Sequence, residues 1–84
     1  MSTKIFVGGL PWSMDDKELK SVFEEYGKVG AAKIVVNRQT GRSKGYGFVE
    51  MEHHSDAETA ITALNKKEIK GRVIDVALAR SRRT

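Results

Sequence analysis

Cysteine is absent from this chain of 84 residues. The sequence therefore has no disulfide framework, no thiolate metal site and no cysteine nucleophile, a composition that fits a reducing compartment. Long apolar segments are absent too, because the longest uncharged run, Ile5 to Met14, covers ten residues and a membrane-spanning helix needs about 20. We expect no membrane-spanning helix.

We also expect no export signal. Residues 1–4 provide no basic and apolar leader with a small-residue cleavage site. Secretion through a signal peptide is therefore disfavoured. We expect a cytoplasmic localisation, or a nuclear one if the organism is a eukaryote.

The length and composition are typical of one small domain. Hydrophobic residues make up 39% of the chain and charged residues 31%, which provides apolar side chains for a core and argues against wholesale disorder. Lysine and arginine number 15 against 11 aspartate and glutamate residues, and this net charge of +4 favours a polyanionic partner. We expect a monomer with one domain at residues 1–80 and a short basic tail at residues 81–84.

The first half of the chain predicts a strand followed by a helix. Lys4 to Val7 is β-branched and aromatic, and it stops at a pair of glycines, which is typical of a strand. Asp15 and Glu18 have the spacing of a capping box and predict the start of a helix. The apolar residues of this helix follow i, i+3, i+4, i+7 spacing: Leu19, Val22, Phe23 and Tyr26. Gly27 suits the left-handed residue past its end.

The second half predicts two strands, a helix and a last strand. The pattern predicts two strands, Val29–Val36 and Lys44–Glu52, on either side of a turn-prone stretch. Ser55 and Glu58 repeat the capping-box spacing and predict a helix that ends at Asn65. A final strand is expected at residues 73–79, so the order is strand, helix, strand, strand, helix, strand.

Strand periodicity predicts which side chains face solvent. Alternate residues of a strand point to opposite faces, and two helices can cover only one face of a single sheet. If Val49 and Met51 face the helices, the other face of that strand carries Lys44, Tyr46, Phe48 and Glu50. On the first strand the same alternation leaves Lys4 and Phe6 on the open face.

Three aromatic rings are therefore expected on a face that no helix covers. Exposing rings forgoes hydrophobic burial, so such a cluster marks a binding surface rather than a core. Gly45 and Gly47 strengthen this interpretation, because side chains at these positions would crowd the helices or hold them away.

Two segments resemble the signatures of the RNA recognition motif family. Ile5–Leu10 resembles its six-residue signature, and Lys44–Met51 resembles its eight-residue signature, in which glycines alternate with aromatics after a basic residue. Both lie on predicted strands, and the resemblance covers about residues 4–80. It implies an α+β, ferredoxin-like βαββαβ sandwich, in which a four-stranded antiparallel sheet has two helices packed on one face.

The resemblance also implies how single-stranded RNA is bound. Phe6 and Phe48 take the places whose aromatics stack on neighbouring bases, and Tyr46 takes the place that packs against sugars. The candidates for contacts to the RNA backbone are Lys44, Lys4, Lys33, Arg42 and Arg80. The sequence does not separate RNA from single-stranded DNA.

Charge placement supports the open face as the binding surface. Residues 37–44 carry +3 with no acid, and three arginines follow the last strand, whereas residues 15–25 sum to −3. Ala77 departs from the family pattern, because a polar residue that reads a base is often found at this place. Base reading from the last strand is therefore not expected.

Other chemistry finds little support. His53 and His54 are adjacent, so their side chains diverge on a regular element and cannot both bind one metal ion. Trp12 is expected to pack the loop above the first helix. We see no catalytic constellation and expect neither an enzyme nor a cofactor.

The alternative function is a protein-interaction module that uses the helical face of the same fold. An enzyme of acylphosphatase-like topology ranks third, because residues 8–13 contain no arginine to hold a phosphate.

Overall fold

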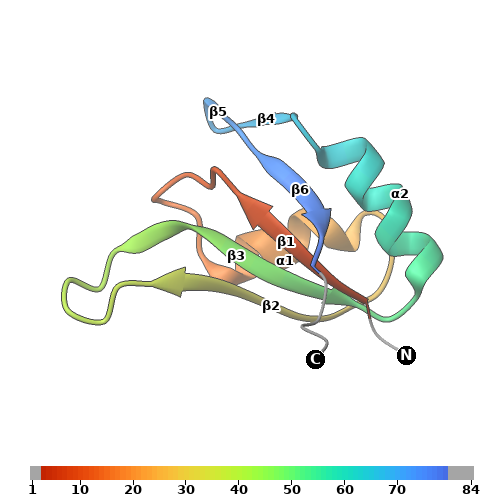
Figure 1. Cartoon of the computed structure of the whole chain (residues 1–84), viewed down its shortest axis with the longest axis horizontal. Coiled ribbons are helices and arrows are strands. Elements are labelled where there is room, and N and C mark those ends of the chain that lie inside the picture. The colour runs from red at the N-terminus through yellow and green to blue at the C-terminus, as the bar shows by residue number, and fades with distance from the viewer. Residues whose placement is uncertain (1–2, 80–84) are drawn as a thin grey trace.

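Two helices pack against one face of a four-stranded sheet, as Figure 1 shows with the sheet in front of α1. The computed structural model describes residues 3–79, and at residues 43 and 44 it describes the backbone only. The elements are β1 (Thr3–Gly8), α1 (Asp16–Glu24), β2 (Val29–Val36), β3 (Ser43–Met51), α2 (His54–Leu64), β4 (Glu68–Ile69), β5 (Arg72–Val73) and β6 (Asp75–Leu78).

The main sheet has the strand order β2-β3-β1-β6, and every neighbouring pair is antiparallel. Helix α1 packs on β2 and β3, and α2 packs on β1, β3 and β6. This arrangement confirms the predicted ferredoxin-like fold. Of the helices within residues 3–79, neither is long and apolar enough to cross a membrane.

Strand alternation places the core as predicted. Ile5 and Val7 of β1 and Val49 and Met51 of β3 are fully buried beneath the helices. The helices contribute the following buried side chains: Leu19, Phe23, Ala57, Ala60 and Leu64. Because period 2 in the strands and period 3.6 in the helices direct apolar residues to the same layer, one core results.

The first helix begins where the capping spacing predicts. The Asp15 carboxylate accepts a hydrogen bond from the Glu18 backbone N–H at 2.9 Å. The Asp16 carboxylate accepts one from the Ile34 N–H at 2.8 Å, which ties the start of α1 to β2. The Glu18 side chain does not turn back to the cap but forms an ion pair with Lys70 of the β4–β5 hairpin at 2.9 Å.

The end of α1 differs from the prediction. Glu25, the cap residue after the helix, has a right-handed backbone, and Gly27 is not among the residues with positive φ. A Cβ at Gly27 would instead collide with the Asp56 side chain of α2. Glycine at this position is therefore explained by the close approach of the α1–β2 turn to the Asp56 side chain of α2, and not by a left-handed cap.

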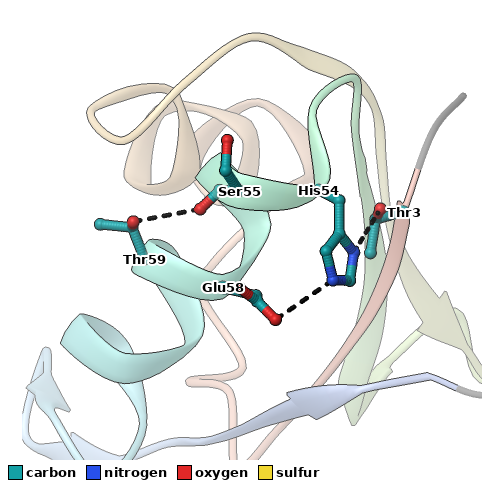
Figure 2. Close-up of polar contacts among 5 residues, drawn as sticks. All are labelled: Thr3, His54, Ser55, Glu58 and Thr59. Atoms are coloured by element: carbon teal, nitrogen blue, oxygen red, sulfur yellow. Dashed lines mark hydrogen bonds and ion pairs between the residues drawn. The ribbon is translucent and has the colours of Figure 1, made fainter.

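The start of α2 also differs from the prediction. His53 is the residue before the helix and forms no side-chain cap, and Ser55 lies inside the first turn, where its carbonyl accepts from the Thr59 hydroxyl. Figure 2 shows that His54 instead contacts Thr3 of β1 and Glu58 one turn further along, at 3.2 and 3.1 Å. The contact with Thr3 joins residues distant in sequence, so the local capping pattern does not reveal it.

The last predicted strand is divided in the structure. β6 is shorter than expected, and residues 72–73 pair with residues 68–69 in a separate β4–β5 hairpin. Lys70 and Gly71 form its turn, with φ values of 52° and 85°. A tight hairpin turn with both central residues at positive φ is normal for glycine but unusual for lysine, so Lys70-Gly71 predicts this turn only weakly.

The two glycines of β3 are needed for reasons other than the predicted crowding against the helices. Gly45 has a φ of 85°, which a side chain would strain. A Cβ at Gly47 would collide with the backbone of Lys33 and Ile34 in β2. The crowding thus lies between neighbouring strands and not between the sheet and the helices.

We predict that Gly47→Ala destabilises the fold by about 1–3 kcal/mol, because β2 must move away from β3 to admit the methyl group. The free energy of unfolding, measured by urea denaturation, tests this. Gly30→Ala in β2 is the control, since its Cβ would lie 3.7 Å from the nearest atom, an ordinary contact. Equal stability of the Gly47→Ala variant and the wild type would contradict the prediction.

Candidate nucleic-acid interface

Three aromatic rings form one cluster on the face of the sheet opposite the helices. The ring centroid of Phe6 lies 5.9 Å from that of Tyr46 and 5.8 Å from that of Phe48. The centroids of Tyr46 and Phe48 are 6.4 Å apart. All three side chains are half-buried. The rings therefore support one another sideways and still present surface to solvent.

The register of the strands brings these rings together. Phe6 is the direct partner of Phe48 across β1 and β3, and Lys33 of β2 is the partner of Phe48 on the other side. Ala77 of β6 completes the row next to Phe6. Direct partners in an antiparallel pair share a face, so one row crosses all four strands of the sheet.

Lys4 lies on the same face and contacts the cluster. Its ammonium nitrogen stands 5.0 Å from the centroid of the Phe48 ring. This is a cation–π geometry, which at an exposed site contributes about 0.5–1 kcal/mol. The contact holds a positive charge directly beside an aromatic surface.

The positive charges near the rings are available to a ligand. Lys4, Lys33 and Arg42 are exposed, and within the described side chains none of them is in an ion pair. By contrast, Lys66 and Lys70 are both neutralised by carboxylates. A polyanion at the open face would therefore not have to displace an acidic partner from these three side chains.

The β2–β3 loop that carries Arg42 is ordered by hydrogen bonds. The Asn37 side chain accepts from the backbone N–H groups of Gln39 and Thr40, at 2.8 and 3.2 Å. The Asn37 N–H donates to the Arg42 carbonyl at 2.8 Å, which closes the loop. The turn predicted from sequence is thus stabilised by hydrogen bonds within the loop, which hold Arg42 at the end of the β2–β3 hairpin. This hairpin extends beyond the rest of the sheet in Figure 1.

Two predicted candidates cannot be placed on this surface. Arg80 lies outside the described residues, and for Lys44 the structure describes the backbone alone. The rings at positions 6, 46 and 48 and the lysines at positions 4 and 33 are brought together on one face. Among residues 3–79, no group of three metal-ligating side chains converges.

The expectation for Trp12 is wrong. Its side chain does not pack over α1 but is 71% exposed, more than any other large hydrophobic side chain described. It lies at a hollow that is also lined by Met14, Lys17 and Val36. The apolar residues of this loop that join the core are Leu10 and Met14, which are buried.

Comparisons with known proteins agree with this geometry. The family model of the RNA recognition motif matches residues 5–75. Glycine-rich RNA-binding protein 4, mitochondrial, of Arabidopsis thaliana is 46% identical over 82 residues, covering 98% of this chain and 60% of that protein. RNA-binding protein CP31B, chloroplastic, of the same plant is 44% identical, covering 94% of this chain and 27% of that protein. The chain thus spans little more than half of the length of the first relative.

Solved structures give the same result. The crystal structure of RNA binding protein PG1 superimposes with a TM-score of 0.91 at 39% identity, covering 98% of this chain and 99% of that one. The RNA recognition domains 1 and 2 of Sex-lethal from Drosophila melanogaster match with a TM-score of 0.88 at 33% identity, covering 94% of this chain and 50% of that one.

The comparisons contradict the expected cytoplasmic or nuclear localisation. Cytoplasmic or nuclear localisation was inferred from the lack of cysteine and of an export leader, but the matched plant relatives are named as mitochondrial or chloroplastic proteins. The prediction failed because a chain without cysteine is compatible with several compartments, so the absence of cysteine does not discriminate among them.

The family assignment rests on agreement between independent observations. The fold has the expected strand order, the two signature segments lie side by side as β1 and β3, and their aromatic residues meet on the uncovered face. The family model covers these same strands. The chain belongs to the RNA recognition motif family.

Proposed function

We propose that the chain binds single-stranded RNA on the open face of its sheet. The observation that carries this proposal is the cluster of three half-buried rings, which neither helix of residues 3–79 covers. In this proposal Phe6 and Phe48 stack on two neighbouring bases, and Tyr46 packs against the sugars between them. The relatives named as RNA-binding proteins support it.

The expected affinity follows from the number of stacked bases. Stacking of a base on an aromatic side chain contributes about 1–3 kcal/mol. Two or three stacked bases, with phosphate contacts screened by salt, correspond to a dissociation constant around micromolar. We propose that Lys4, Lys33 and Arg42 supply phosphate contacts from the described surface, and that Lys44 and Arg80 add to them.

The unit proposed for this activity is a monomeric domain at residues 1–80, followed by a basic tail at residues 81–84. Binding of another protein through the helical face is the alternative function. The two are separable, because Glu24 is exposed on α1, in the layer away from the rings. Glu24→Lys would abolish capture of a protein partner by the helices but leave stacking on the open face intact.

Removal of the rings is expected to weaken RNA binding without unfolding the domain. Phe48→Ala should cost about 1–3 kcal/mol of binding free energy, and the Phe6→Ala, Phe48→Ala double variant should lose both stacks. Titration of a fluorescent single-stranded RNA measures the affinity, and thermal melting measures the stability.

Phe23→Ala is the control for the ring variants. This phenylalanine is fully buried on α1, so its removal should reduce the free energy of unfolding by about 3–5 kcal/mol. If the Phe48→Ala variant melted like the Phe23→Ala variant while its RNA affinity held, the open-face rings would be structural and the proposed function would be wrong.

The arginines at positions 80, 82 and 83 are expected to bind RNA without regard to sequence. They follow the last strand, where a basic segment can lie along RNA stacked on the rings, and contacts to phosphate carry no base information. Replacing all three by alanine should weaken every RNA similarly and reduce the slope of log affinity against log salt by up to about 0.7 per lost contact. Affinity measured over a salt series tests this, and a sequence-selective loss with an unchanged slope would contradict it.

A further inference from the structure

Glu50 places a carboxylate on the face proposed to bind a polyanion. It lies on β3 two residues after Phe48, and its direct partners are Lys4 of β1 and Ala31 of β2. Its side chain is half-buried on the open face. Alternate residues of a strand are about 6.6–6.8 Å apart, so a base stacked on Phe48 can extend its edge to the Glu50 carboxylate.

The Glu50 carboxylate has no partner among the described side chains. It forms none of the ion pairs, and Lys4, which stands opposite, directs its ammonium group to the Phe48 ring. Asp75, whose register also places it on this face, differs, because it is paired with Lys66. Glu50 therefore carries a charge that no described side chain neutralises, on the same face of the sheet as Phe48.

An unpaired carboxylate at this position needs hydrogen-bond donors once RNA covers it. The phosphates repel it, and loss of water without a new partner would oppose binding. RNA offers donors on the 2′-hydroxyl of each ribose and on the base edges, and only the base edges differ among the four nucleotides. Glu50 thus favours bases whose edge donates to a carboxylate.

Among the four bases, guanine fits a carboxylate best. Its Watson–Crick edge has two adjacent donors, N1–H and the N2 amino group, which match the two oxygens of a carboxylate. In adenine and cytosine the amino group is beside a ring nitrogen that accepts, and in uracil the N3–H lies between two carbonyl oxygens. Each of these edges places a lone pair against the carboxylate.

We propose that Glu50 is a specificity-determining residue that selects guanine at the base stacked on Phe48. The carboxylate accepts hydrogen bonds from guanine N1–H and N2–H, and Ala31, which is small and exposed, leaves space beside it on β2. This inference rests on the proposed RNA binding. It assigns base reading to β3, whereas Ala77 offers no side-chain donor or acceptor on β6.

The test uses oligouridine that carries a single guanosine, inosine, adenosine or cytidine at its centre, with unsubstituted oligouridine for comparison. A uridine background lets the RNA slide until the substituted base reaches its preferred site. We expect the wild type to bind the guanosine oligonucleotide about 10-fold more tightly than oligouridine. Inosine, which lacks the N2 amino group, should lose about 3- to 5-fold of that preference.

The Glu50→Gln variant removes one of the two acceptors and the charge. Its affinity for oligouridine should stay equal or rise, and its preference for guanosine should fall to about 2-fold or less. Glu24→Gln, the same change on the exposed surface of α1, is the control and should retain the wild-type preference. Thermal melting should be alike for all three proteins.

Several outcomes would overturn the inference. A Glu50→Gln variant that keeps the wild-type preference for guanosine would show that another group reads the base. A wild type that binds all the oligonucleotides equally would show that Glu50 selects nothing. Failure of the wild type to bind any of the oligonucleotides would contradict the proposed function itself, and is thereby distinguished from failure of the guanine assignment.

Discussion

The antiparallel register of β1 and β3 places Phe6 directly across from Phe48 in the centre of the sheet. Because side chains alternate between the faces, the same register buries Ile5 and Val49 beneath the helices. A slip by one residue would exchange the two sets, exposing the core and burying the rings. Core packing and the ring surface therefore depend on one set of backbone hydrogen bonds.

The helices complete this constraint by covering only one layer. Helix α1 is fixed at its start by the Asp15 cap and by the bond from Asp16 to β2, so its buried residues meet the sheet at a defined position. The opposite face keeps rings that contact one another at 5.8 to 6.4 Å. Side chains held in this way lose less freedom when a base stacks on them, which favours binding by a small surface.

The sequence predicted most of the fold and the composition of the open face. Phe6, Tyr46 and Phe48 were placed there by period 2 alone, and the structure agrees. The errors at Ser55, Gly27 and Trp12 have different causes. At Ser55 and Gly27 a local rule was overridden by a contact between distant segments, His54 with Thr3 in the first case and Asp56 against Gly27 in the second. Near Trp12, the loop buries Leu10 and Met14 and leaves the tryptophan side chain exposed.

The order of elements, the buried faces and the presence of three rings on one side were determined by the sequence itself, because periodicity is a local property of the chain. Only the tertiary structure decided that Lys4 turns its charge to Phe48, that Lys66 neutralises Asp75 and that no described side chain pairs with Glu50. Side-chain pairing on a sheet depends on the relative positions of strands that are distant in sequence. Sequence spacing within one strand contains no record of those positions.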